Sequence, residues 1–389
     1  MQLALIQQSL TEEGLDGWLF FDHHVRDPLA YRVLGLSAPP AVSRRWYYLV
    51  PAAGEPRGLV HRIERSILDS LPGAKRAYSS WTEQVEGLAR LLSGCRRVAM
   101  QYSPRCAIPY ISMVDAGTVE LVRSLGVEVA SSANLIQYFE ARWTPEKLQY
   151  HLEAGRRVDA IRAAAFGLIG DRLRAGAGIT EFEVKQFVLE RFREAGLVTD
   201  HGPIVAVNAN ASNPHYEPQS STSLEIRRGD CVLLDMWAKL DTPEAVYYDI
   251  TWTGCCGPQP PSQVENVFHV VRTARDRAIE FVGQAAAEQR ALRGFEVDDA
   301  ARAYIIEQGY GQYFTHRTGH SIGVEVHGAG ANMDNFETHD ERRVIPWTCF
   351  SIEPGIYLPE FGIRSEVNVF IDEEEARVTG EIQQQLVLI

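Results

Sequence analysis

Hydrophobic and polar positions along the first third of the chain repeat with the periods of short helices and strands. Apolar residues at helical spacing predict helices over residues 2–13, 81–92 and 111–125. Short apolar runs predict strands over residues 18–21, 45–50, 58–61 and 98–102. The stretch 53–56 between two of these runs favours a hairpin turn. Residues 1–140 are therefore expected to form a small α/β domain.

The pattern breaks between residues 131 and 142, and a long helical pattern follows. Thr144 followed by Pro145 is a strong helix start, because threonine caps free N–H groups and proline suits the first turn. The length of 389 residues also favours more than one domain. We therefore place a boundary near residue 140 and expect domains over 1–140 and 141–389.

Residues 141–389 contain a similar order of elements twice, each time a pair of helices followed by strand-rich sequence. Capping boxes predict helix starts at Thr180, with Glu183, and at Ser262, with Glu265. The second of these helices is expected to run to about residue 290, and a shorter helix is expected over 297–308. Strands are expected over 204–208, 231–237 and 245–252 and again toward the end of the chain. This order predicts an α+β domain built from two similar halves.

Composition and charge narrow the possible partners. The net charge of −13 argues against binding to nucleic acid or to an anionic membrane. The first residues lack a basic n-region and a long apolar h-region, and no run approaches about 18 apolar residues, so neither a signal peptide nor a membrane span is expected. The six cysteines show no CxxC spacing, which favours reduced thiols. We expect a cytoplasmic protein without a nucleic-acid or membrane partner.

The stretch HRTGHSIGVEVHG gathers three of the eleven histidines, His316, His320 and His327. Histidine is both a common metal ligand and a general acid or base near neutral pH. The glycines at 319 and 323 disfavour a helix here, and Arg317 stands where an HExxH motif would carry glutamate. From this stretch alone, a loop whose histidines only make structural hydrogen bonds remains an equal alternative.

Four carboxylates lie on otherwise apolar strand patterns, at Asp235, Asp249, Glu353 and Glu366. Burying one such charge without a partner costs several kcal/mol, so a cationic group must gather them. One arginine could neutralise one or two acids, and any single acid could be a solvated residue. Four acids together with His320 more naturally hold two divalent metal ions about 3.5–4 Å apart. Oxygen ligands with one imidazole suit Mn²⁺, Co²⁺, Fe²⁺ or Zn²⁺.

In these residues the chain resembles the pita-bread metallopeptidases, which include methionine aminopeptidase, aminopeptidase P and prolidase. The five metal ligands of that family fall, in order, on Asp235, Asp249, His320, Glu353 and Glu366. The flanking motifs stand as GHSIGVEVH at 319–327, EPGIY at 353–357 and GIRSE at 362–366. The sequence Pro-His-Tyr at 214–216 and the extra His316 resemble the proline-specific members of the family. Among these members the chain most resembles prolidase.

This resemblance implies a catalytic pita-bread domain, with two similar halves of a helix pair and antiparallel strands, over 141–389. It also implies a small creatinase-like N-terminal domain over 1–140, and a homodimer. The implied activity is hydrolysis of the Xaa-Pro bond in dipeptides or short peptides by a water or hydroxide that bridges two divalent metals. Mn²⁺ is the first expectation, and Co²⁺, Zn²⁺ and Fe²⁺ stay open.

The resemblance also assigns roles within the metal shell. Asp249 and Glu366 would bridge the metals, Asp235 would complete one shell, and His320 with Glu353 would complete the other. Glu353 would also take the proton of the attacking water.

Four further residues would act on the substrate or position the ligands. His327 and His316 would stabilise the oxyanion or hold the carboxyl side of the substrate. His215 would contact the substrate or move a proton. Arg364 would orient Glu366 or the substrate terminus.

Some positions depart from the family pattern. The two aspartates lie fourteen positions apart, a longer separation than the family usually shows. Gly328 follows His327 and Val367 follows Glu366, where the family often has acidic residues. The open alternatives are an aminopeptidase P acting on longer Xaa-Pro peptides, a non-peptidase hydrolase or lyase, and a non-catalytic protein that binds a peptide or protein.

Overall fold

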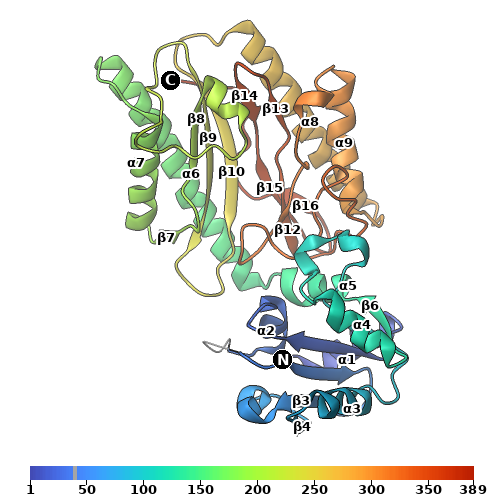
Figure 1. The fold of residues 1–389 in the computed structure, drawn as a ribbon. Coiled ribbons are helices and arrows are strands. Elements are labelled where there is room, and N and C mark those ends of the chain that lie inside the picture. Colours follow the sequence, from blue (N-terminus) through green and yellow to red (C-terminus); the bar gives the residue numbers. More distant parts are fainter. Residues whose placement is uncertain (38–41) are drawn as a thin grey trace. The chain divides into compact units, whose positions relative to one another are not determined.

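The computed structural model describes residues 1–37 and 42–389, which form two compact units over 1–140 and 141–389 (Figure 1). Each unit has its own hydrophobic core. In the part of the chain that the structure describes, no helix is long and apolar enough to cross a membrane.

The first unit is built on a six-stranded sheet with the order β4-β3-β2-β1-β5-β6. Only β2 runs antiparallel to its neighbours, and the other five strands run in one direction. The strands are β1 (Gly17–Asp22), β2 (Trp46–Pro51), β3 (Arg57–His61), β4 (Ala74–Tyr78), β5 (Arg97–Met100) and β6 (Glu128–Ser131). The helices are α1 (Leu3–Glu12), α2 (Pro28–Leu34), α3 (Trp81–Leu91), α4 (Ala116–Ser124) and α5 (Ala133–Ile136).

The helix predicted over 111–125 starts later than expected. Asp115 is its N-cap, since the side chain accepts a 2.9 Å hydrogen bond from the backbone N–H of Thr118. An aspartate side chain that bonds nearby backbone N–H groups is unfavourable inside a helix but favourable at its N-cap, so the helix begins after Asp115. The helix α4 therefore begins at Ala116, and residues 111–115 lie outside it, Ile111 being the end of a short 3-10 turn, Pro109–Ile111.

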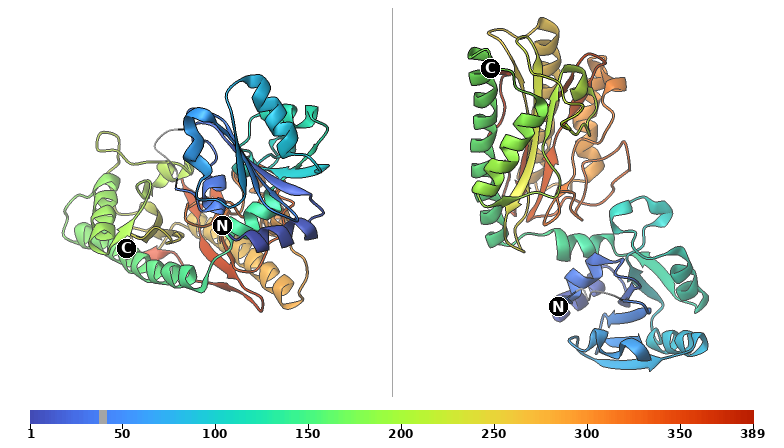
Figure 2. Two further views of the ribbon diagram at one scale, coloured as in Figure 1. Left: turned by 90° about the horizontal axis from the view of Figure 1, so that it is seen from below. Right: turned by 60° about the vertical axis from the view of Figure 1, so that its left-hand side comes forward.

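The second unit consists of two halves, each with two helices against mainly antiparallel strands, as predicted from the sequence; only the short β17 pairs in parallel, with β10, among the described strands of this unit. In one half α6 (Pro145–Arg174) and α7 (Glu181–Glu194) pack with a five-stranded sheet. Its strands are β7 (Leu197–Val198), β8 (Ile204–Val207), β9 (Cys231–Leu240), β10 (Tyr248–Cys255) and β17 (Val387–Leu388). Figure 2 shows α6 and α7 lying along these strands. The prediction of an α+β domain with a repeated order is confirmed.

The other half has α8 (Ser262–Ala287) and α9 (Gly294–Glu307) against a four-stranded and a two-stranded sheet. The strands are β11 (Ser321–Ile322), β12 (Thr348–Ile352), β15 (Val367–Ile371) and β16 (Ala376–Val378), and then β13 (Gly355–Tyr357) and β14 (Gly362–Arg364). The predicted capping box at Ser262 is wrong, because Ser262 is the first helical residue and Pro261 stands at the N-cap without a side-chain bond. The last helix starts at Gly294 rather than 297, since Glu296 accepts a 2.7 Å hydrogen bond from the N–H of Arg293.

The two halves meet where β10 lies beside β15 (Figure 1). The amide side chain of Asn368 replaces a regular strand ladder at this point. Its Oδ1 accepts from the backbone N–H of Asp249 at 3.1 Å, and its Nδ2 donates to the Asp249 carbonyl. The backbone N–H of Glu366 donates to the Thr251 carbonyl at 3.0 Å. These bonds bring two carboxylate-bearing segments, far apart in sequence, next to each other.

A close helix–strand approach depends on Gly155 in α6. A Cβ atom there would lie 2.8 Å from ring carbons of the buried Tyr248 on β10. We predict that Gly155→Ala lowers the free energy of unfolding by about 1–3 kcal/mol, because the packed ring cannot move away. Urea unfolding at equal metal content measures the change.

Gly167 in the same helix is the matched control, since a Cβ atom there would meet nothing within 4 Å. Gly167→Ala should leave stability unchanged or raise it by up to about 1 kcal/mol through helix propensity. Equal effects of the two substitutions would contradict the packing argument.

Candidate metal centre

Two aspartates project from one face of the β9–β10 hairpin. In the antiparallel register Asp235 lies opposite Thr251, and Asp249 lies opposite Trp237. The two aspartates are therefore diagonal neighbours on adjacent strands, and their side chains share a face. Both side chains are almost fully buried. The hairpin thus supplies the first two of the five predicted ligands.

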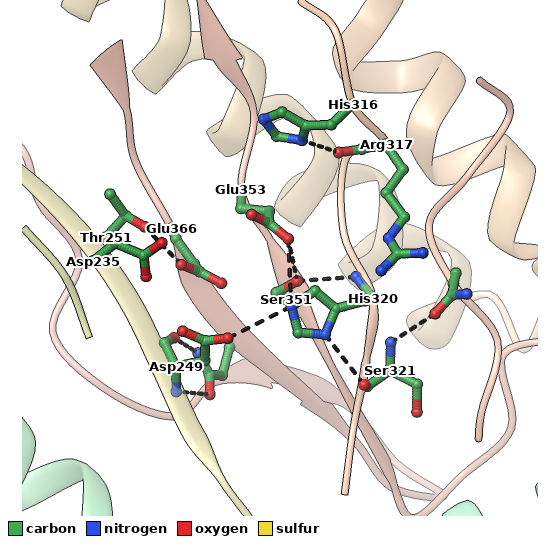
Figure 3. A network of polar contacts seen from close by, with 12 residues as sticks. Asp235, Asp249, Thr251, His316, Arg317, His320, Ser321, Ser351, Glu353 and Glu366 are labelled. Carbon is green, nitrogen blue, oxygen red and sulfur yellow. Dashed lines mark hydrogen bonds and ion pairs between the residues drawn. The ribbon is translucent and has the colours of Figure 1, made fainter. Parts of the chain in front are cut away.

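Glu366, Glu353 and His320 come from the other half. Glu366 lies between β14 and β15, Glu353 directly follows β12, and His320 directly precedes β11. The Ser351 hydroxyl links the last two: it accepts from the backbone N–H of His320 at 2.9 Å and donates to Glu353 Oε1 at 3.1 Å. The Thr251 hydroxyl donates to Glu366 Oε2 at 2.8 Å. Figure 3 shows the five predicted ligands facing one another.

The core of this cluster is compact. Asp249, His320 and Glu366 each offer a ligand atom, and these atoms lie within 4.8 Å of one another. The Nε2 atom of His320 is 3.5 Å from Asp249 Oδ2 and 3.4 Å from Glu353 Oε1. Distances of this size leave room for an ion between the ligand atoms.

The carboxylates of the cluster carry more negative charge than the described protein neutralises. Burial first, and then the neighbouring carboxylates, raise the pKa of Asp249 and of Glu366 well above the ordinary range. Burial also raises the pKa of Glu353 to about 7. The Oδ1 atom of Asp249 and the Oε1 atom of Glu366 have no hydrogen-bond partner among the described residues. Buried polar atoms without partners point to a missing cationic ligand.

His320 is oriented for metal binding. Its Nδ1 atom lies 3.2 Å from the Ser321 carbonyl oxygen, so this nitrogen carries the proton. Burial holds the pKa of His320 well below its usual value, so the ring is neutral. The lone pair of Nε2 then faces Asp249 and Glu353. One imidazole and four carboxylates are a donor set that fits two divalent ions.

Arg364 positions two of the acids. Its Nη2 donates to Asp235 Oδ2 at 2.5 Å, and its Nε donates to the Thr251 hydroxyl at 3.0 Å. That hydroxyl in turn donates to Glu366, so Arg364 reaches Glu366 through Thr251 and not directly. Its Nη1 donates to the Tyr357 hydroxyl at 2.8 Å. The guanidinium is buried and fully engaged with the protein.

The two other histidines of the stretch differ in their surroundings. His316 is held at both nitrogens, by the Arg317 carbonyl at 2.7 Å and the Tyr357 hydroxyl at 2.6 Å. Burial lowers the pKa of His316 to about 3. His327 keeps an exposed side chain, and its ring centroid lies 4.4 Å from that of His320. Desolvation, followed by the positive charge of Arg317 and by the neighbouring His215, lowers the pKa of His327 to about 4.

The exposed His215 lies near enough to His327 for the two rings to influence each other electrostatically. The structure therefore brings His215, His327 and the five ligands into one region. It places His316 behind this region, next to Tyr357.

An ion pair that the sequence pattern did not indicate holds the histidine stretch in place. Asp298 and Arg302 on α9 pair at 2.7 Å, a spacing that in the sequence is also typical of a solvated helix face. Here Asp298 is fully buried and accepts from the backbone N–H of Thr318 at 2.8 Å. Arg302 donates to the carbonyl oxygens of Phe314 and His316. The pair thus fastens the backbone that leads to His320.

Glu181 is a second missed residue. In the sequence it is one of two acids in the first turn of a helix, which is ordinary. In the structure it is fully buried and organises the segment that carries His215. Its oxygens accept four hydrogen bonds of 2.7–2.9 Å, from Val207 N, Asn210 Nδ2, Tyr216 OH and Leu224 N.

Comparisons with known proteins agree with this geometry. The chain is 30% identical over 215 residues to an Xaa-Pro dipeptidase of Lactobacillus delbrueckii subsp. lactis, and this alignment covers 55% of the chain and 53% of that protein. The chain therefore matches that relative over only about half of its length. It is also 26% identical over 399 residues to a probable dipeptidase PepE of Mycobacterium bovis, covering 100% of the chain and 96% of that protein.

Solved structures show the same fold over the full chain. A dipeptidase from Pyrococcus horikoshii aligns with a TM-score of 0.68 at 25% identity and covers 100% of both chains. Dipeptidase PepE from Mycobacterium ulcerans aligns with a TM-score of 0.74 at 23% identity, over 100% of this chain and 96% of that one. The predicted pita-bread fold is confirmed. The sequence pattern of metallopeptidase family M24 matches residues 149–373, more than half of the chain, and the chain therefore belongs to that family.

Proposed function

We propose that the protein hydrolyses the Xaa-Pro bond of dipeptides or short peptides with two divalent metal ions, Mn²⁺ first among them. Asp235, Asp249, His320, Glu353 and Glu366 would hold the ions. The observation that carries this proposal is the buried cluster of carboxylates in which Asp249 and Glu366 each keep an oxygen without a partner. Relatives named Xaa-Pro dipeptidase and probable dipeptidase support the substrate class.

When bound, two divalent ions supply Lewis-acid activation of water and of the peptide carbonyl. Glu353 would take the proton of the attacking water. Its Oε1 is held by the Ser351 hydroxyl at 3.1 Å, and burial raises the pKa of Glu353 to about 7. A general base works best when its pKa lies near the working pH. Asp249 and Glu366 would each offer the ions an oxygen that has no hydrogen-bond partner among the described residues.

His327 and His215 are proposed to bind the substrate, because both side chains are exposed next to the cluster. His327 would face the carbonyl oxygen on which negative charge develops. His316 would act indirectly, because both of its nitrogens are engaged and its Nε2 fixes the Tyr357 hydroxyl. Arg364 would orient Asp235 directly, and Glu366 through Thr251.

The homodimer and the cytoplasmic location remain part of this proposal. The resemblance to the family supports the dimer, and size-exclusion chromatography with light scattering would test it, a monomeric mass being the contrary result. The cysteines are free thiols, and Cys231 lies opposite Cys255 on paired strands. Neighbouring thiols persist in reducing compartments, which supports the cytoplasm. Recovery of these two residues as a disulfide from the producing cells would contradict that location.

The substrate class is tested with Mn²⁺- and Co²⁺-supplemented assays on Ala-Pro, Ala-Pro-Ala and Met-Ala-Ser. We expect hydrolysis of Ala-Pro, because the site residues follow the pattern of the proline-specific members. Cleavage of Ala-Pro-Ala with little action on Ala-Pro would select aminopeptidase P activity instead. No cleavage of either proline peptide at full metal occupancy would overturn the proposal and favour a peptide-binding role.

Asp249→Asn tests the metal centre while keeping the side-chain shape. Metal affinity and kcat/KM should each fall by more than about 100-fold, since even residues behind the ligands are worth 10–100-fold. The effect of Asp249→Asn on the free energy of unfolding should have opposite signs in the metal-free and the metal-bound protein. Removing an uncompensated buried carboxylate should stabilise the metal-free protein by about 1–4 kcal/mol. With Mn²⁺ present, the wild type should be the more stable protein, because bound ligand stabilises the folded state.

Metal analysis and thermal unfolding with and without EDTA measure these effects. Asp241→Asn, at an exposed position in the loop of the same hairpin, is the control and should behave as wild type. Full activity and metal content in Asp249→Asn would remove Asp249 from the proposed centre.

Glu181→Gln tests the support of the His215 segment. Glutamine has one acceptor oxygen and would point N–H donors at groups that donate themselves, so several of the four hydrogen bonds are lost. We expect KM for Ala-Pro to rise by about tenfold, with metal content unchanged and a smaller loss in kcat, because the segment binds substrate and not metal.

The matched control is Glu190→Gln on the same helix, where the carboxylate is exposed and pairs with the exposed Arg193. It should leave KM unchanged, since exposed ion pairs contribute little. A fall in metal content in Glu181→Gln would instead assign Glu181 to the metal centre.

A further inference from the structure

A cleft of about 540 Å³ opens on the first unit. Four of its lining residues lie at the carboxyl ends of three parallel strands: Phe21 is the next-to-last residue of β1, His23 follows β1, His61 ends β3, and Tyr78 ends β4. In open α/β sheets, ligands bind outside the carboxyl ends of the strands. Every lining residue belongs to residues 1–140, so the cleft shares no residue with the metal centre.

The cleft is rich in positive charge. Arg26, Arg44 and Arg45 line it, and all three side chains are exposed. Arg26 and Arg45 have no ion-pair partner within the described ranges 1–37 and 42–389, while the backbone of Arg44 bonds the carboxylate of Glu64. Among the described residues that line the cleft, Asp115 is the only acidic one, and its oxygens already accept hydrogen bonds from Thr118.

This excess of cations is local. Residues 1–140 contain fourteen Lys and Arg and fourteen Asp and Glu, so the unit as a whole is formally neutral. The net charge of −13 belongs entirely to residues 141–389. A concave surface with unpaired arginines on a neutral unit favours an anionic ligand.

The loop after β1 holds its part of the cleft in a fixed shape. The buried carboxylate of Asp22 accepts hydrogen bonds from the backbone N–H groups of Val25, Arg26 and Asp27. The Tyr31 hydroxyl donates to the same carboxylate at 2.8 Å. The loop turns through two successive positive φ angles, 69° at His24 and 55° at Val25. Positive φ is rare for a β-branched residue and marks a backbone held by its surroundings, often at a functional site.

One rim of the cleft carries a large exposed ring. Trp81 is the first residue of α3, lines the cleft and is 74% exposed. An exposed tryptophan beside arginines suits a flat apolar ring that carries an anionic group. The N-terminus of α3 adds the positive end of a helix dipole on the same side.

We propose that this cleft binds a small dianionic molecule with a flat ring, of the aryl phosphate class. Arg26, Arg44 and Arg45 bind the anionic group, and Trp81 packs against the ring. The site is independent of peptide hydrolysis at the metal centre, and it gives residues 1–140 a ligand-binding function of their own.

Calorimetric titration of the full-length, metal-loaded protein with phenyl phosphate tests the proposal. The wild type should bind it saturably, and more weakly as ionic strength rises. The double variant Arg26→Gln/Arg45→Gln should bind at least about tenfold more weakly, and Trp81→Ala should also weaken binding. Benzoate, which has the ring but a single charge, should bind more weakly than phenyl phosphate.

Arg90→Gln is the matched control, because Arg90 is an exposed arginine of α3 that does not line the cleft. It should bind as wild type. Asp249→Asn separates the two sites: binding that survives in this variant and is lost in the double variant supports the cleft. Binding lost in Asp249→Asn but kept in the double variant would place the ligand at the metal centre and overturn the proposal.

Two other results would also overturn it. One is the absence of saturable binding to the wild type at millimolar phenyl phosphate. The other combines two observations: the wild type does not bind phenyl phosphate, and Arg26→Gln/Arg45→Gln changes the oligomeric state. Together they would show that a second copy of the chain covers the cleft. Loss or retention of Xaa-Pro hydrolysis bears only on the metal centre.

Discussion

The second unit is organised around a charge that the described protein does not neutralise by itself. Four carboxylates and one neutral imidazole face one another in a buried region, and the nearby Arg364 pairs directly with Asp235. Asp249 and Glu366 keep oxygen atoms without hydrogen-bond partners among the described residues. Such an arrangement is unfavourable until cations enter, so the same feature that lowers stability without metal supports tight binding of metal.

The fold brings this charge together from two similar halves. One half supplies both aspartates from a single hairpin, and the other supplies the histidine and both glutamates from segments next to three different strands. The halves are joined at the centre itself, where the Asn368 amide bonds the backbone of Asp249 and Thr251 bonds Glu366. Because Asp249 and Glu366 belong both to this joint and to the five predicted ligands, the packing of the halves sets the relative positions of these two carboxylates.

A chain of hydrogen bonds next to the ligands gives the histidines of this stretch different environments. Arg364 connects Asp235 to Tyr357, and Tyr357 connects to His316, whose nitrogens are then both engaged. His327 makes no such hydrogen bond within residues 1–37 and 42–389, and its side chain is exposed. Three histidines within a dozen residues therefore lie in three different environments: one among the carboxylates, one in the supporting network and one at the surface.

The sequence by itself determined the residue types of the site and the order of the elements. Strand alternation places Asp235 and Asp249 on matching faces of a hairpin, and the motifs around His320, Glu353 and Glu366 indicate a metallopeptidase. Only the tertiary structure decided which side chains are buried and which distant segments they bond, because local sequence patterns do not contain this information. Burial and hydrogen bonds between distant segments made Glu181 a support for the His215 segment, and turned Asp298–Arg302 inward. The arginine-lined cleft exists because β3 and β4 pair in parallel and their ends meet the loop after β1, a neighbourhood that depends on sheet order and not on sequence spacing.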